Sequence, residues 1–176
     1  MNKIFRAGPG FPVPDGSIVQ SVLDPRLASE QRASWVDDVS LAVGTIPANT
    51  TSQIHLHPVV TQVTWVLSGK LTVKMKDPDS KIPYTLNLSP EESVLTQPGT
   101  FFQLINVNAQ ECRVLYMVTP AFIFEATAEG VRYNDAIVLE EGWEDLTAKK
   151  WILPQLQELE RVRQKRRESI ERLKKN

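Results

Sequence analysis

Histidine and cysteine are scarce in this chain of 176 residues, which has two histidines and one cysteine, Cys112. A single cysteine excludes an intrachain disulfide, and with it the class of secreted domains held together by disulfides. No further histidine is present to activate the thiol. We therefore expect Cys112 to be a small buried apolar residue and not a nucleophile.

Long apolar runs are also absent from the sequence. No stretch has the roughly 20 apolar residues that cross a membrane, and the first eight residues lack the apolar segment of a secretory signal. Together with the single cysteine, these absences lead us to expect a cytoplasmic protein with no membrane partner.

Neither sign of charge is in large excess, because the formal net charge is -1. This value excludes the strong whole-molecule attraction that basic proteins have for nucleic acid. Residues 161–175 are locally basic, with eight Lys or Arg against two acids. They have no interleaved aromatic residues and no groove-reading motif, so we expect a solvated helix and no nucleic-acid partner.

Short apolar stretches separated by turn residues occupy the middle of the chain. Many short strands with regular turns are typical of a sandwich or a barrel. In one stretch Leu71, Val73 and Met75 alternate with polar residues, which predicts one buried and one solvated face. The predicted strands are Val39–Ile46, Gln53–His57, Val63–Leu67, Leu71–Lys76, Tyr84–Leu88, Ser93–Thr96, Phe101–Asn106 and Arg113–Val118.

The two ends of the chain differ from the middle. The first part is rich in Gly, Pro and Ser, and predicts turns with one short strand at Ser17–Leu23. Near the other end apolar residues recur at helical spacing, which predicts a helix at about 154–174. Its polar stretch Arg163–Ser169 is expected to face solvent. The chain thus divides into an N-terminal arm (1–34), a barrel (35–125) and a C-terminal extension (126–176).

The two histidines stand together as His55-Leu56-His57. Residues i and i+2 of a strand point to the same face, so the two imidazoles are expected to project side by side. Gln62 follows five residues later, and an amide oxygen is a weaker but acceptable third ligand for a metal that binds imidazole.

This arrangement resembles the first motif of the cupin family, in which the position of Gln62 is usually Glu. The second cupin motif is matched downstream, where Gly99 and Asn106 keep their places. Gln97 stands where the family has a proline, and Phe102 stands where it has its last histidine ligand. The positions that match the first motif are Gly44, His55, His57, Gln62 and Gly69.

The resemblance implies an all-β fold with a single cupin barrel, a double-stranded β-helix or jelly roll. It also implies a divalent metal (Fe, Mn, Ni or Zn) held by His55, His57 and Gln62. These three neutral ligands should bind more weakly than the family's usual three histidines and one glutamate. They leave coordination positions open for an anionic chelating substrate and O₂, as in non-haem iron oxygenases, with Gln62 in place of the carboxylate.

Side chains near these ligands are candidates for substrate binding. Gln53 precedes His55 by two residues and should share its inward face, although a place at the barrel rim fits equally well. Phe102 would add an apolar wall, and Trp65 and Tyr116 suit the core as well as the pocket. The candidates are Gln53, Thr64, Phe102, Asn106 and Tyr116.

Three classes of function are considered, of which the first two fit these residues, and no residue is assigned a catalytic role. The first is a metal-dependent enzyme with oxygenase-type chemistry on a small organic molecule, or else isomerase or lyase chemistry. The second is a metal-free cupin whose His55 and His57 contact a small ligand directly. The third, a DNA-binding regulator, needs a helix-turn-helix for which residues 1–34 leave no room.

The stretch Thr119–Glu125 resembles the apolar strand with which cupin barrels end and which often pairs with a second subunit. We therefore expect a homodimer. Phe122 and Phe124 are then either dimer contacts or core residues.

Overall fold

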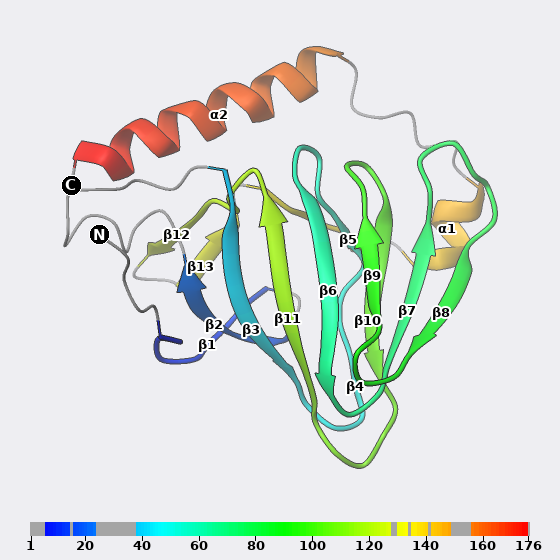
Figure 1. The fold of residues 1–176 in the computed structure, drawn as a ribbon. Helices are drawn as coiled ribbons and strands as arrows, with labels where there is room; N and C mark the ends of the chain where they lie inside the picture. The colour runs from blue at the N-terminus through cyan, green and yellow to red at the C-terminus, as the bar shows by residue number, and fades with distance from the viewer. Residues whose placement is uncertain are drawn as a thin grey trace.

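The computed structural model describes residues 6–14, 16–23, 38–127, 130–133, 135–140, 142–148 and 156–175. Within these ranges, two six-stranded antiparallel sheets form the walls of a β-barrel, and a long helix lies across one end of it (Figure 1). The all-β barrel with a C-terminal helix that the sequence predicts is confirmed.

The first sheet contains the longest strands and joins the N-terminal segment to the barrel. The strand predicted at Ser17–Leu23 is present and pairs with the first long barrel strand, so this part of the arm belongs to the sheet. The expected boundary at residue 34 lies outside the described residues. The order of strands is β1 (Phe11–Pro12), β2 (Ile18–Leu23), β3 (Ser40–Ile46), β11 (Cys112–Thr119), β6 (Thr61–Ser68) and β9 (Ser93–Thr96).

The second sheet faces the first and carries the histidines on a short strand. Its order is β14 (Ile137–Val138), β5 (His55–Leu56), β10 (Phe101–Asn106), β7 (Leu71–Lys76) and β8 (Tyr84–Leu88), with β4 (Thr50–Thr51) also paired to β10. The remaining elements are a hairpin and two helices: β12 (Phe124–Thr127), β13 (Gly130–Tyr133), α1 (Trp143–Ala148) and α2 (Leu156–Lys175). The boundary expected after residue 125 falls within β12.

The main core lies between the inner faces of the two sheets. Alternate residues of β7 point inward as predicted, since Leu71, Val73 and Met75 are each at most 1% exposed. Val66 of β6 and Val114 of β11 meet them from the opposite sheet. Burying such side chains contributes roughly 1.5–3 kcal/mol each.

The outer face of the second sheet is covered in part, and the prediction that Leu71–Lys76 has one fully solvated face is wrong at Lys76. Lys76 is only 1% exposed, with Nζ 5.2 Å from the ring centroid of Phe101. A second apolar cluster joins Phe101 to Leu146 of α1, and the indole N–H of Trp143 donates to Gln103 Oε1 at 2.7 Å. The alternation of β7 could not reveal that a later helix packs on this face.

The helix α2 is not solvated along its whole predicted polar stretch. Arg163 and Arg167 are exposed, but Arg166 and Ser169 are 7% and 2% exposed. The prediction that all of Arg163–Ser169 faces solvent is therefore wrong, because one side of the helix packs on the rest of the molecule. None of the helices in the described ranges has the length and hydropathy of a membrane span.

Candidate functional site

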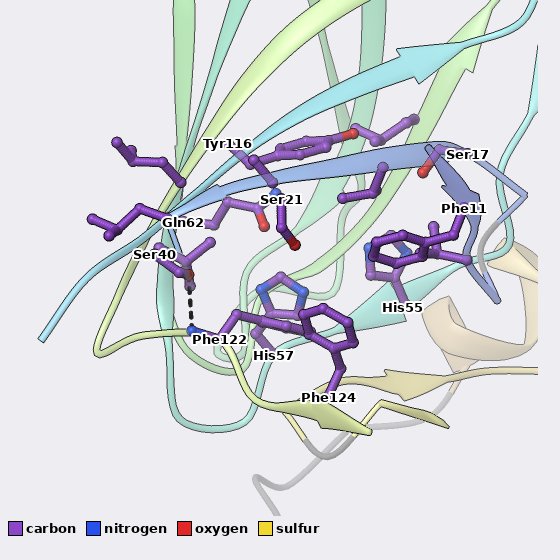
Figure 2. A pocket seen from close by; sticks show the side chains of 17 residues that line it. Phe11, Ser17, Ser21, Ser40, His55, His57, Gln62, Tyr116, Phe122 and Phe124 are labelled. Atoms are coloured by element: carbon purple, nitrogen blue, oxygen red, sulfur yellow. Dashed lines mark hydrogen bonds between the residues drawn. The ribbon is translucent and has the colours of Figure 1, made fainter. Parts of the chain in front are cut away.

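A pocket opens between the two sheets and holds the predicted histidines (Figure 2). Its volume is about 80 Å³, several times the roughly 10–15 Å³ that a cavity needs to hold one water. No Asp, Glu, Lys or Arg is among the described residues that line it. The polar lining consists of Ser17, Ser21, Ser40, His55, His57, Gln62 and Tyr116, and the other ten lining residues are apolar.

The two imidazoles lie next to each other, as the i, i+2 spacing predicts. Their ring centroids are 5.7 Å apart, and each residue is 3% exposed. Nδ1 of His55 lies 3.1 Å from the backbone oxygen of Gln53. A carbonyl oxygen only accepts hydrogen bonds, so in the neutral ring Nδ1 carries the proton and the lone pair is on Nε2. This is the tautomer in which an imidazole binds a metal through Nε2.

His57 is held as a neutral base. Burial lowers the pKa of His57 well below its ordinary value of 6.5, and the neighbouring His55 lowers it further. In the described part of the chain Nδ1 of His57 has no hydrogen-bond partner. A neutral imidazole with an unsatisfied buried nitrogen is suited to a metal or to a hydrogen-bonding ligand.

Gln62 completes the predicted ligand set from the opposite sheet. It lines the pocket and is 7% exposed. Its Nε2 donates to the Thr64 hydroxyl at 3.0 Å. This bond occupies the amide nitrogen and leaves the amide oxygen, the atom that can ligate a metal, available to the pocket. Thr64 is buried and is not part of the lining, so it orients Gln62 instead of contacting the cavity.

Phe102 lies against both histidines. It is paired with His55 across β5 and β10, and its ring centroid is 4.0 Å from that of His55 and 5.1 Å from that of His57. The place that the resemblance assigns to a ligand is therefore adjacent to the histidines, but it is filled by a ring that cannot coordinate. Phe102 is 1% exposed and supports the imidazoles from behind, since it is not among the lining side chains.

Tyr116 lines the pocket from β11, and Gly44 makes room for it. A Cβ at position 44 would lie 2.3 Å from Cε2 of Tyr116, which is closer than atoms can approach. The glycine that matches the first cupin motif thus permits the tyrosine ring to lie flat on β3.

Two predicted pocket residues lie elsewhere. Gln53 is exposed and precedes β5, so the prediction that it shares the inward face of His55 is wrong: strand alternation does not extend to it. Asn106 does not line the pocket either. Its Nδ2 donates to the backbone oxygens of Ile46, Pro47 and Gln110 at 2.9–3.1 Å, which holds the turn before β11.

Most of the pocket wall was not foreseen from the sequence. β1, β2 and the segment after β11 supply much of it, and the rings of Phe11 and Phe124 stack at 5.5 Å between centroids. The alternation of Val19, Ser21 and Leu23 in β2 could have indicated an inward face. It could not have indicated which sheet edge the arm would join.

The donor set fits a divalent metal, although weakly. Two imidazoles bound to one metal at about 2.1 Å have centroids roughly 5 Å apart when they occupy adjacent positions, close to the 5.7 Å observed. Gln62 adds an amide oxygen. Among the described residues no cluster of three His, Cys, Asp or Glu is present, and none of those that line the pocket is a carboxylate.

Residues 42–118 match the family model described as a cupin domain. The chain contains a cupin domain. The matched residues include Gly44, both histidines, Gln62 and Phe102. The motif resemblance seen in the sequence is therefore confirmed for the part of the chain that builds the barrel.

Solved structures of other proteins share the fold of this chain. KdgF from Halomonas sp. is 14% identical, with a TM-score of 0.52 over 67% of this chain and 94% of its own. The capsular polysaccharide assembling protein CapF from Staphylococcus aureus is 16% identical, with a TM-score of 0.55 over 77% of this chain and 33% of its own.

An oxalate oxidase in complex with glycolate is 24% identical, with a TM-score of 0.52 over 68% of this chain and 58% of its own. The cupin fold of this chain thus occurs in at least one enzyme. Similarity at these identities establishes the fold alone. A search of curated protein sequences found no significant match.

Proposed function

We propose that this cupin domain is a metal-dependent enzyme with oxygenase-type chemistry on a small organic molecule. The observation that carries the proposal is the pair of buried imidazoles beside Gln62, whose amide nitrogen is occupied by Thr64. Isomerase or lyase chemistry is the alternative reaction for the same site.

His55, His57 and Gln62 would hold Fe, Mn, Ni or Zn, metals that accept imidazole and oxygen ligands. A bound metal of this kind supplies Lewis-acid polarisation of a substrate oxygen and, for iron, activation of O₂. The neutral donor set favours a substrate that brings its own negative charge through an enolate or carboxylate oxygen.

The rest of the pocket determines which chemical groups the substrate can have beyond its metal-binding oxygens. Of the lining residues in the described part of the chain, ten are apolar and none is a carboxylate, lysine or arginine. The walls would bind an apolar or aromatic body by burial, and the ring packing of Phe102 and Phe122 around His57 would keep water from it. The hydroxyl of Tyr116, which lines the pocket, would donate to the oxygen end of the molecule.

Metal analysis of protein purified without chelators tests the proposal. We expect close to one metal per chain, and a loss of most of it in His55→Ala and in His57→Ala. Gln53→Ala is the matched control, because Gln53 is exposed and its contact to His55 uses the backbone oxygen. Substoichiometric metal that neither histidine variant lowers further would contradict a metal site.

An oxygen electrode separates the reaction classes once metal is bound. We expect O₂ consumption when small monoanions with an apolar body and an enol or carboxylate group are added to the iron-loaded protein. Turnover without O₂ consumption would favour the isomerase or lyase alternative.

A metal-free binding protein is the second candidate, and Phe102 favours it. The phenyl ring occupies the position of a ligand in the resembling family, and His57 has a buried Nδ1 ready for a hydrogen bond. This candidate predicts small-molecule binding that EDTA leaves unchanged, measured by calorimetry with and without the chelator.

A further inference from the structure

One arginine of α2 is inserted into the body of the molecule. Arg166 forms a buried ion pair with Oδ2 of Asp135 and also donates to the backbone oxygen of Ala121. Asp135 is 0% exposed, and the same Oδ2 accepts the backbone N–H of Ile123 at 2.6 Å. Two backbone groups of the segment Ala121–Phe124 are therefore bonded to one ion pair.

This segment forms one wall of the pocket. Phe122 and Phe124 both line the cavity, and the Phe122 ring centroid is 5.4 Å from that of His57 (Figure 2). The backbone N–H of Phe122 donates to the Ser40 hydroxyl at 2.9 Å. The hydrogen bonds of three successive residues thus fix the backbone from which the Phe122 ring reaches His57.

The neighbouring arginines of α2 have ordinary surface environments. Arg163 pairs with Glu160 and the Arg163 side chain is 48% exposed, while Arg167 is exposed and bonds to Gln164. Burying a charged pair is costly unless it is fully hydrogen-bonded, and such pairs serve in some proteins to select one arrangement. Arg166 spans from the helix to the pocket wall.

We propose that Arg166 is a positioning residue, which acts through Asp135 and Ala121 to hold the Phe122 wall against His57. The C-terminal helix thereby determines the shape of the pocket although the helix lines no part of it in the described chain. The inference concerns the protein without ligand and does not depend on a bound metal.

The scarcity of histidine makes a direct test possible, because NMR spectra of the imidazoles contain signals from only two rings. In Arg166→Gln we expect the His57 ring signals to shift, since Phe122 loses its position. The His55 signals should change much less, since His55 packs on Phe102 at 4.0 Å. Exchange of the Ile123 amide proton should become faster by about tenfold or more.

Arg163→Gln and Arg167→Gln are matched controls that remove the same charge from exposed positions of the same helix. They should leave both histidines and the Ile123 amide unchanged. The proposal is overturned if Arg166→Gln behaves like them. It is also overturned if the His55 signals shift as much as those of His57, which would indicate a general rearrangement of the barrel.

A second variant covers the case in which Arg166→Gln does not fold. The double change Arg166→Met with Asp135→Leu replaces the ion pair by apolar side chains of similar size, which proteins commonly tolerate. It still removes the acceptor of the Ile123 N–H and the donor to Ala121. A folded double variant with slow Ile123 exchange and unshifted His57 signals would refute the positioning role, whatever its metal content.

Discussion

His57 is an ionisable side chain that is almost completely buried, between the rings of Phe102 and Phe122. It can serve as a ligand or an acceptor only as a neutral base, and burial lowers its pKa well below 6.5. The same burial ties the stability of the fold to pH, in a direction that follows from where the proton binds.

As pH falls below about 6.5, the unfolded chain binds a proton at His57 and the folded chain does not. The stability that His57 contributes is thus present above pH 6.5 and is lost as pH falls toward the lowered pKa. We expect the free energy of unfolding in chelator to drop by about 1 kcal/mol more for the wild type than for His57→Asn between pH 7.5 and 5.5. Urea unfolding measures this difference, and identical pH profiles would contradict a neutral buried His57.

Gly44 has a different role: it leaves space for the ring of Tyr116. In Gly44→Ala the new methyl group would meet the Tyr116 ring at 2.3 Å, so the ring must move. We expect a loss of about 1–3 kcal/mol in the free energy of unfolding, typical of overpacking in a core. Gly142→Ala is the control, since its nearest atom would be 3.9 Å away; equal losses in both variants would contradict the explanation.

Single residues were predictable where a short-range pattern determines them. The i, i+2 spacing placed His55 and His57 on one face, and motif spacing placed Phe102 beside them. Gln53 was misplaced, because the strand begins only at His55. The contact of Thr64 with Gln62 was not foreseen, because the sequence does not show which of two inward side chains hydrogen-bonds the other.

Among the elements, the barrel strands follow closely from alternation and turn residues. β7, β8, β9 and β10 have the predicted ends. The path of the N-terminal segment and the docking of α2 could not be predicted from the sequence, because both depend on contacts between residues far apart in the chain. Arg166 and Asp135, 31 residues apart, are the clearest example: an arginine in a polar helical stretch has the same local pattern whether it faces water or an aspartate.

The energetic difference between the two kinds of arginine in α2 is measurable. Removing one member of a buried pair leaves an uncompensated charge, so Arg166→Gln should lower the free energy of unfolding by about 3–5 kcal/mol. Arg163→Gln breaks only an exposed pair with Glu160, which is worth at most about 1 kcal/mol. Urea unfolding of both variants provides the comparison. A loss below about 1 kcal/mol for Arg166→Gln would show that the pair is not desolvated.

At the scale of the whole molecule, the outer face of the first sheet has neighbouring exposed apolar side chains. Trp65 and Leu67 of β6 are 40% and 44% exposed, and Leu95 of the adjacent β9 is 53% exposed. Contiguous exposed apolar side chains mark interaction surfaces. Phe122 and Phe124 are occupied in the pocket wall, so this face is the better candidate for the contact of the homodimer that we expect.

Light scattering at micromolar concentration should accordingly give the mass of two chains. Leu95→Lys should shift the population toward one chain, because it places a charge on the apolar face. Val107→Lys is the control: Val107 is 71% exposed in the turn that follows β10. A monomeric wild type, or equal behaviour of the two variants, would contradict this arrangement.

The position of Phe102 has a consequence for redesign of the pocket. It lies directly across from His55 in the β5–β10 pair, so one substitution, Phe102→His, would place a third imidazole beside the existing two. The gain in affinity for metal would come with a loss of open coordination sites and of the apolar backing that keeps the histidines dry. Residue 102 is therefore a position at which evolution or protein engineering can raise the affinity for metal at the cost of space for a substrate, or the reverse.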